Sequence, residues 1–212
     1  RYFMQSKIVA ISVAKVRKFI PKGNQGAFVS SAIHKSAVST LENPAAQEID
    51  QYGFKEDEQA DRRVHGGVDK AIYAYPEENY PFWAEILQRE VRHGTLFPLQ
   101  FGLVGENLTT QGLTEETVFV ADQWRIGEVL CQVTQFREPC FKLNLKMQYS
   151  GAAKAMLQSA KSGWYLKVLE GGSLRAGDQI QVIPGRRELS IAQQNRDFLN
   201  QRGQLDIEPD LY

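Results

Sequence analysis

The chain has 212 residues, with 25 basic and 25 acidic side chains and a formal net charge of zero. Its contents of 42% hydrophobic and 24% charged residues are those of an ordinary globular protein. The balanced charge lacks the basic footprint of a nucleic-acid binder, so we do not expect nucleic acid as a partner. No stretch approaches the roughly 18 apolar residues of a membrane span. Two cysteines nine positions apart make no disulfide framework, and a cytoplasmic location is the simplest expectation.

Patterns typical of β-strands dominate the chain up to about residue 184. Apolar and polar residues alternate from Ile8 to Val16. Further strands are predicted over residues 27–33, 71–75, 117–120, 129–134, 165–169 and 179–183. Their spacing is irregular, with helices and loops between them, which argues against a simple meander. The predicted class is therefore mainly β with peripheral helices.

Two helices are predicted between these strands. Pro76 can open the first at its first position, and Tyr80, Trp83 and Leu87 then share one face. The second is predicted from about Ser150 to Gly163. These apolar faces indicate core packing rather than a cofactor motif.

The character of the sequence changes after Pro184. Residues 7–184 are predicted to form one domain, and residues 185–212 a C-terminal helical tail. Within the tail, residues 188–202 form a polar, weakly amphipathic stretch that favours a short helix. The tail is too small to fold as an independent domain.

The two cysteines have different surroundings. Cys131 lies in a strand pattern and shares a face with Val129 and Val133, as a small core hydrophobe would. Cys140 follows Pro139, beyond the end of that strand, with cationic residues nearby in the sequence. Cations favour the thiolate, the form that binds metals or attacks an electrophile. On this local pattern alone, an inert thiol and a reactive thiol remain equally open.

A glycine pair interrupts the structural pattern between residues 61 and 71. Gly66 and Gly67 permit backbone conformations and close approaches that other residues resist. Charged and basic residues flank the pair: Arg62, Arg63, His65 and Lys70. Such a loop could hold an anion through N–H groups and cationic side chains. The alternative is a glycine turn whose charges face solvent.

Other motifs give weaker signals. Glu106 and Asn107 follow a glycine, so either could point into a cavity or cap a turn. The chain has no HExxH and no GxSxG motif, and its three histidines are scattered, which argues against a structural zinc site and against a hydrolase. A dyad of Cys140 with His65 remains possible, because such partners need only be close in space.

Three segments in this order resemble a known family. HGGVDKA at residues 65–71, GENLT at 105–109 and REPCFKL at 137–143 are similar to the MOSC domain, named after the C-terminal part of molybdenum cofactor sulfurases. The small bacterial YiiM-like branch, which is similar in chemistry to mitochondrial amidoxime-reducing components, matches best. The resemblance covers roughly residues 7–184.

This resemblance implies a fold and a site. The fold is a closed β-barrel of the pyruvate-kinase-barrel type, with the molybdenum cofactor (molybdopterin) in a cleft beside it. Cys140 matches the family's molybdenum ligand, and Cys140, His65 and Arg137 are the expected catalytic residues. The residues expected to bind the cofactor are His65, Gly66, Gly67, Lys70, Asn107, Arg137 and Cys140. The cationic members would hold the pterin phosphate or offset the charge of the metal centre.

The function implied is a molybdenum-dependent reductase of N-hydroxylated compounds, such as hydroxylamino-purines or amidoximes. The chain has no flavin or nicotinamide fingerprint, so electrons would come from a separate reductase. A homodimer is possible, and pyridoxal phosphate is not expected. One alternative is a sulfur or cofactor carrier that uses Cys140 without redox turnover. Another is a barrel that binds an anionic ligand and catalyses nothing.

The chain departs from the family's pattern in two places. Glu56 stands where the family often has a glycine before Asp57, so we expect that turn to differ from the family's. YiiM-like proteins commonly carry a C-terminal module of three helices, and only residues 188–202 could represent it here.

Overall fold

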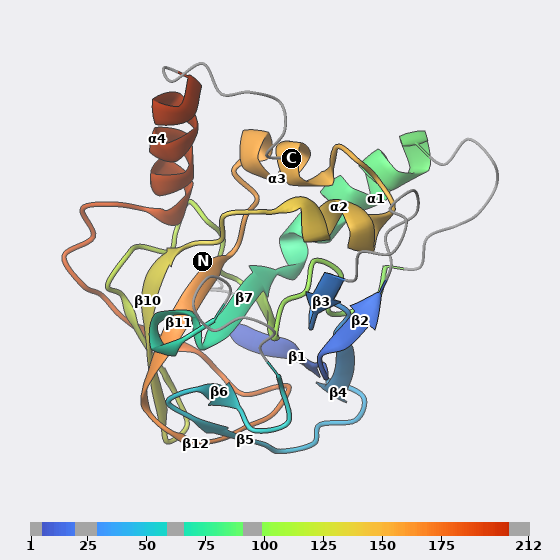
Figure 1. Ribbon diagram of the computed structural model, residues 1–212. Coiled ribbons are helices and arrows are strands. Elements are labelled where there is room, and N and C mark those ends of the chain that lie inside the picture. Colours follow the sequence, from blue (N-terminus) through green and yellow to red (C-terminus); the bar gives the residue numbers. More distant parts are fainter. Residues whose placement is uncertain (1–5, 20–28, 59–65, 91–98, 204–212) are drawn as a thin grey trace.

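The computed structural model describes residues 6–19, 29–58, 66–90 and 99–203 (Figure 1). The strands are β1 Lys7–Val13, β2 Arg17–Phe19, β3 Val29–Ser31, β4 Ser36–Thr40, β5 Gln47–Asp50, β6 Gly53–Phe54, β7 Ile72–Pro76, β8 Leu108–Gln111, β9 Gln123–Ile126, β10 Val129–Phe136, β11 Trp164–Glu170, β12 Gly172–Leu174 and β13 Gln181–Ile183. The helices are α1 Tyr80–Glu90, α2 Phe141–Met147, α3 Ala152–Ser159 and α4 Ile191–Gly203, with short 3-10 helices η1 Val68–Lys70 and η2 Glu77–Asn79.

One curled sheet of eight strands organises the fold. Its order is β13-β9-β10-β11-β7-β8-β1-β4, and β7 and β8 run parallel. No ladder joins the edge strands β4 and β13 in the described residues. The curl does bring the segment before β13 to β1, where Lys7 bridges Gln179 and the Ile8 N–H donates to the Asp178 carbonyl at 2.9 Å. The class is mainly β as predicted, but the sheet is a half-barrel, so the expected closed barrel is met only in part.

The inner face of this sheet forms the main core. On β10, Val129, Cys131 and Val133 point inward and are almost completely buried, as the alternation predicts. Trp124 and Trp164 are fully buried and meet edge to face, with ring centroids 5.7 Å apart. Such aromatic pairs stabilise a core beyond the area that they bury. The prediction that Cys131 is a core residue is therefore confirmed.

Helices α1, α2 and α3 gather on one side of the sheet and enclose a second core (Figure 1). Trp83 of α1 is buried there, and Tyr80 packs against the same cluster. Leu87 of α1 is also buried, as the spacing of the three residues predicts. Pro76 ends β7, and the η2 turn intervenes before α1 begins at Tyr80, so Pro76 does not open the α-helix as predicted.

Within the described residues, every helix is too short or too polar for a membrane span.

The structure corrects two further element predictions and adds a helix that was not predicted. Residues 117–120 form no strand, because Thr117 closes a turn on Thr114 and only Phe119 makes a bridge, with Ser190. The helix predicted from Ser150 begins at Ala152 and ends at Ser159. Helix α2, which directly follows Cys140, was not predicted.

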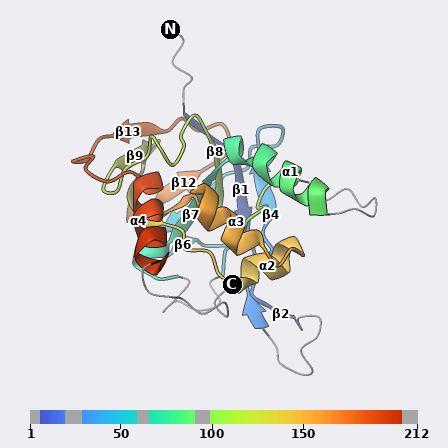
Figure 2. The same ribbon diagram turned by 90° about the horizontal axis from the view of Figure 1, so that it is seen from above.

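Helix α4 contacts β10 and lies next to α3 (Figures 1 and 2). The Asn195 amide donates to the Leu157 carbonyl of α3 at 2.7 Å, and the Phe198 ring lies 5.2 Å from that of Phe136. These contacts attach the helix predicted over residues 188–202 to the sheet. The remaining tail, residues 204–212, lies outside the described residues, and the predicted boundary at 184 stays a prediction.

Gly163, just before β11, offers a sharp test of this packing. Its φ is +65°, and an added Cβ would lie 2.4 Å from the Ala74 carbonyl oxygen. We expect Gly163→Ala to lower the free energy of unfolding by about 3 kcal/mol, because strain and overlap add. Gly127→Ala is the matched control, since φ is +57° there and nothing lies within 4 Å. It should cost about 1 kcal/mol by urea denaturation; equal losses would contradict the assigned close approach.

Candidate functional site

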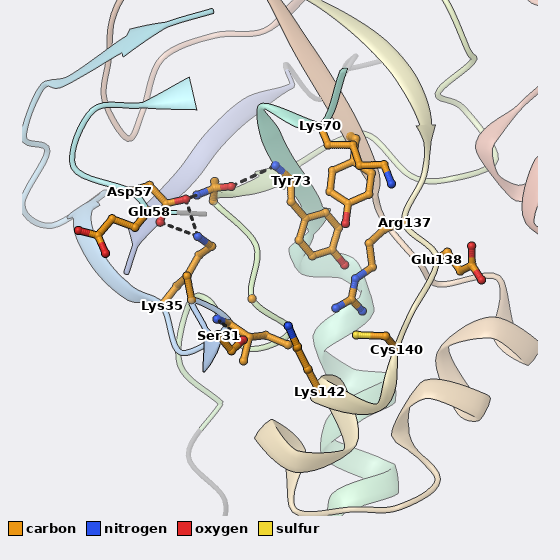
Figure 3. A pocket seen from close by; sticks show the side chains of 15 residues that line it. Ser31, Lys35, Asp57, Glu58, Lys70, Tyr73, Arg137, Glu138, Cys140 and Lys142 are labelled. Carbon is orange, nitrogen blue, oxygen red and sulfur yellow. Dashed lines mark hydrogen bonds and ion pairs between the residues drawn. The ribbon is translucent and has the colours of Figure 1, made fainter. Parts of the chain in front are cut away.

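A pocket lies between the sheet and the start of α2, with about 690 Å³ of empty space including its open mouth (Figure 3). Four of the predicted site residues line it: Lys70, Asn107, Arg137 and Cys140. They come from segments far apart in the sequence, so the fold brings them together. The segment after β3 and the loop before α2 form two of its walls.

Cys140 presents a free thiol to this pocket. The residue caps α2 with an extended backbone, at φ −131° and ψ 172°, and its side chain makes no capping hydrogen bond. The thiol is partly exposed and forms no disulfide. Figure 3 shows its sulfur pointing to the pocket interior, beside the guanidinium group of Arg137. By contrast, burial raises the pKa of the Cys131 thiol to about 12.

Arg137 is a buried cation, only 6% exposed. Its guanidinium carbon lies 5.3 Å from the centroid of the Tyr73 ring, and one of its nitrogens contacts the Met156 sulfur at 3.1 Å. It forms no ion pair with any carboxylate of the described residues. A buried charge that pairs with none of the described carboxylates is costly. An anion in the pocket would offset that cost.

The surroundings nevertheless keep Arg137 charged. Burial alone would lower the pKa of Arg137, but the phenols of Tyr73 and Tyr165 and the thiol of Cys140 outweigh it and raise the pKa. The Arg137 N–H donates to the Gly163 carbonyl at 3.2 Å, and the Tyr73 hydroxyl donates to the neighbouring Ser162 carbonyl at 2.7 Å. These bonds fix the Arg137 backbone and the Tyr73 ring that lies against the guanidinium.

Two lysines add positive charge around Arg137. The Lys70 ammonium lies 5.6 Å from the centroid of the Tyr165 ring. Lys142, two residues after Cys140, donates to the Ser30 carbonyl at 3.1 Å and so ties the start of α2 to β3. In Figure 3 the Glu138 carboxylate points away from the pocket centre. The side of the pocket that holds Cys140 is therefore cationic.

The opposite wall is an ion pair buried by the fold. Both Asp57 oxygens lie 2.6 Å from the Lys35 ammonium, and the two side chains are 7% and 8% exposed. Asp57 also accepts from the Ala14 N–H at 2.7 Å and from the Asn107 amide at 2.9 Å. Burial lowers the pKa of Lys35, and the charge and hydrogen bond of Asp57 oppose that effect. The pair fixes the end of β1 to the loop before β8.

Of the two residues left open in the GENLT segment, Asn107 lines the pocket and Glu106 caps a turn. The Asn107 side chain also accepts from the Tyr73 N–H at 3.1 Å, so it holds β7. Glu106 is fully buried and accepts from the N–H groups of Gly102 and Val104, each at 3.0 Å, and from the Tyr80 hydroxyl. Glu106 is therefore satisfied within the protein.

The glycine loop is described only from Gly66 onward. His65, a predicted catalytic and cofactor-binding residue, lies outside the described residues, as do Arg62 and Arg63. Gly66 and Gly67 are not among the residues that line the pocket. Gly67 instead precedes η1 with φ at 91°, the positive region that glycine favours. That turn sets the position of Lys70.

Sequence reasoning missed Lys35, Tyr73 and Tyr165 as lining residues. The strands that carry both tyrosines were predicted, and the two residues face each other in the β7–β11 ladder. Alternation gave a usable signal, because Tyr73 lies between core residues Ile72 and Ala74 and must face the other side. Lys35 lies in a loop, where no pattern marked it.

This donor set suits an anionic ligand that carries a soft metal. Within the described residues, no group of three His, Cys, Asp or Glu side chains could hold a metal ion alone. A single thiolate can complete the shell of a metal that brings its other ligands with it, and thiolates prefer soft metals. Buried Arg137 and nearby Lys70 and Lys142 fit an anionic or phosphorylated ligand. The residues present thus fit a metal cofactor with its own ligands and a phosphate.

The fold and pocket define a half-barrel β protein with a cationic pocket around one free cysteine. A model of the MOSC domain matches residues 61–181. The uncharacterized protein YflK of Bacillus subtilis is 38% identical over 165 residues, which cover 76% of this chain and 71% of that protein. The crystal structure of YiiM from Geobacillus stearothermophilus has a TM-score of 0.67 and 33% identity, covering 98% of this chain and 93% of the other.

The chain therefore belongs to the MOSC domain family, in its YiiM-like branch. A Gibberella moniliformis protein named reductase is 32% identical over 165 residues, which cover 77% of this chain and 28% of that protein. The match to that reductase thus spans a minor part of its length.

The buried ion pair at the pocket wall generates a prediction. Asp57→Asn leaves Lys35 without its counter-charge, and we expect a loss of about 3 kcal/mol in the free energy of unfolding at pH 7. Lys35 binds its proton more weakly in the folded state than in the unfolded state, so the loss should shrink as pH rises toward 10. Urea denaturation across this range measures both effects.

The matched control is Glu48→Gln, which removes an exposed ion pair with Lys55 at 3.8 Å. Exposed pairs contribute little, so we expect a change below about 0.5 kcal/mol. Equal losses in the free energy of unfolding for Asp57→Asn and Glu48→Gln would show that the buried Asp57–Lys35 pair contributes no more stability than an exposed pair.

Proposed function

We propose that the chain is a molybdenum-cofactor-binding oxidoreductase that reduces N-hydroxylated compounds, such as hydroxylamino-purines or amidoximes. The observation that carries the proposal is the free Cys140 thiol beside the buried Arg137, which pairs with no described carboxylate. Membership of the MOSC domain family supports the cofactor. When bound, the cofactor would supply the two-electron redox chemistry, and the protein would supply binding and orientation.

Each pocket residue then has a role that its contacts support. The Cys140 thiolate would ligate the metal, because it is the exposed soft donor in the pocket. Arg137 would pair with an anionic group of the cofactor, since its charge is buried and held in place by Tyr73. Lys70 and Lys142 would add longer-range attraction for the phosphate. His65, from the glycine loop, is a proposed further contact.

Asp57, Lys35 and Asn107 would keep the opposite wall rigid. Their side chains bond to one another and to the backbone of β1, so they position the pocket rather than exchange protons with a substrate. The pocket opens to solvent, which would admit a small N-hydroxylated substrate and release the amine or amidine with water. Oxygen would thus leave the substrate as water after two electrons and two protons are taken up.

We propose a separate reductase as the electron donor. The sequence has neither a GxGxxG nor a flavin fingerprint, so its electrons would come from another protein. The similarity to a longer protein named reductase supports reduction as the class of reaction.

A carrier of sulfur or of the cofactor is the second candidate function. The observation that favours it is the same partly exposed thiol, because a Cys140 thiolate could take sulfane sulfur from a persulfide donor, whose own thiolate would leave. Mass spectrometry of the native protein separates the two functions. A sulfur adduct of about 32 Da on Cys140 would favour the carrier.

The test of the reductase proposal is Cys140→Ala, made in a host that synthesises the cofactor. We expect the wild-type protein to contain molybdenum and pterin and to reduce an amidoxime with a reduced dye as electron donor. The variant should lose at least about 90% of both the metal and the activity, because the metal loses its protein ligand. Metal analysis and product chromatography measure the two losses.

Cys131→Ala is the matched control, because it removes the other cysteine from the core. It should lower stability by about 1–2 kcal/mol through the cavity that it leaves, yet keep the metal and the activity. Full reductase activity in Cys140→Ala would rule out the proposed role of Cys140.

A further inference from the structure

One face of α4 lies along the segment that leads to Cys140. Gln194, Phe198 and Arg202 are spaced four residues apart, so they share that face. The Gln194 side-chain oxygen Oε1 accepts from the Phe136 N–H at 2.8 Å, and the Phe198 ring lies 5.2 Å from the Phe136 ring. The Arg202 guanidinium donates to the Glu138 carboxylate at 2.8 Å. Three successive turns of the helix thus hold residues 136–138.

The ion pair between Arg202 and Glu138 sets the direction in which the Glu138 carboxylate points. Glu138 lines the pocket and directly follows Arg137, the cation that pairs with no described carboxylate. Its carboxylate nevertheless points away from the Cys140 sulfur in Figure 3 and bonds to Arg202. The Arg202 guanidinium is itself held by stacking, 4.5 Å from the centroid of the Phe198 ring.

We propose that α4 positions the candidate site and that Arg202 holds the Glu138 carboxylate away from Arg137 and Cys140. Released from Arg202, the carboxylate would be free to turn toward Arg137, its neighbour in the chain on the same pocket lining, and neutralise it. The pocket would then attract an anion less strongly. The inference rests on the anion-binding pocket of the proposed function. Arg202 acts through Glu138, as a positioning residue.

The reactivity of the Cys140 thiol tests this inference without any cofactor. We would measure alkylation of the cofactor-free, full-length protein at pH 7 by the anionic reagent iodoacetate, with neutral iodoacetamide as the control for access to the thiol. Arg202→Ala should slow the iodoacetate reaction of Cys140 by about two- to fivefold relative to the iodoacetamide reaction, because the pocket attracts the anion less strongly. Combining it with Glu138→Gln should restore the wild-type rate, because the competing charge is gone. Cys131 is fully buried and should stay unmodified in the folded protein.

Two further variants separate charge from general loss of structure. Arg202→Lys keeps the cation and should alkylate at nearly the wild-type rate. Arg196→Ala removes a second ion pair of the same helix, with Glu116 at 2.9 Å, away from the pocket, and should change nothing. A merely structural role for α4 predicts that Glu138→Gln gives no rescue of Arg202→Ala.

Binding of inorganic phosphate gives the second readout. By calorimetry, Arg202→Ala should weaken phosphate binding by about two- to fivefold, and the added Glu138→Gln should restore it. An Arg202→Ala protein that alkylates and binds phosphate like the wild type would overturn the inference, as would a defect that persists in the double variant. A wild-type protein that takes up neither phosphate nor molybdenum would refute the proposed function instead, and the alkylation rates would still decide the role of α4.

Discussion

The buried charge of Arg137 is the constraint around which the site is built. A guanidinium in the protein interior costs several kcal/mol unless a counter-charge offsets it, and the described carboxylates do not supply one. The protein instead holds the group over the Tyr73 ring and ties its backbone to Gly163. These contacts fix its position without neutralising it. An anion that enters the pocket would pair with this charge and so stabilise the folded protein.

The rest of the fold maintains this arrangement from three directions. Asp57 and Lys35 form a buried pair that closes the wall opposite Cys140. Before β11, the turn at Gly163 places a carbonyl where Arg137 needs it, and a side chain there would collide with β7. At the end of β10, α4 holds the segment between Phe136 and Glu138. The four residues 137–140, which join β10 to α2, are thus held by contacts from the turn before β11 and from α4.

Much of this could be predicted from local pattern. Alternation correctly separated the buried Cys131 from Cys140, and the order of three motifs identified the family. The pocket does bring Lys70, Asn107, Arg137 and Cys140 together, although their roles stay predictions.

What the sequence could not reveal depends on contacts between distant residues. Lys35 lies in a loop, and its ammonium group is held at the pocket wall by the carboxylate of Asp57, 22 positions away in the sequence. The short helix α2 begins at the residue after Cys140, where a proline and a cysteine gave the pattern of a turn. Residues 117–120 are β-branched or aromatic, as is typical of a strand, but Asp122 accepts from the Phe119 N–H and favours a turn. Local turn chemistry overrode strand propensity there.

The central claim is that Arg137 holds its charge for an anionic ligand and not for stability. The most direct measurement is the melting temperature of wild-type and Arg137→Met proteins with and without inorganic phosphate. Our account predicts that Arg137→Met is as stable as the wild type or more so without phosphate, because a buried cation is replaced by an apolar side chain. It also predicts that phosphate stabilises only the wild type. A variant that unfolds at a much lower temperature, yet is stabilised by phosphate as strongly as the wild type, would contradict the account.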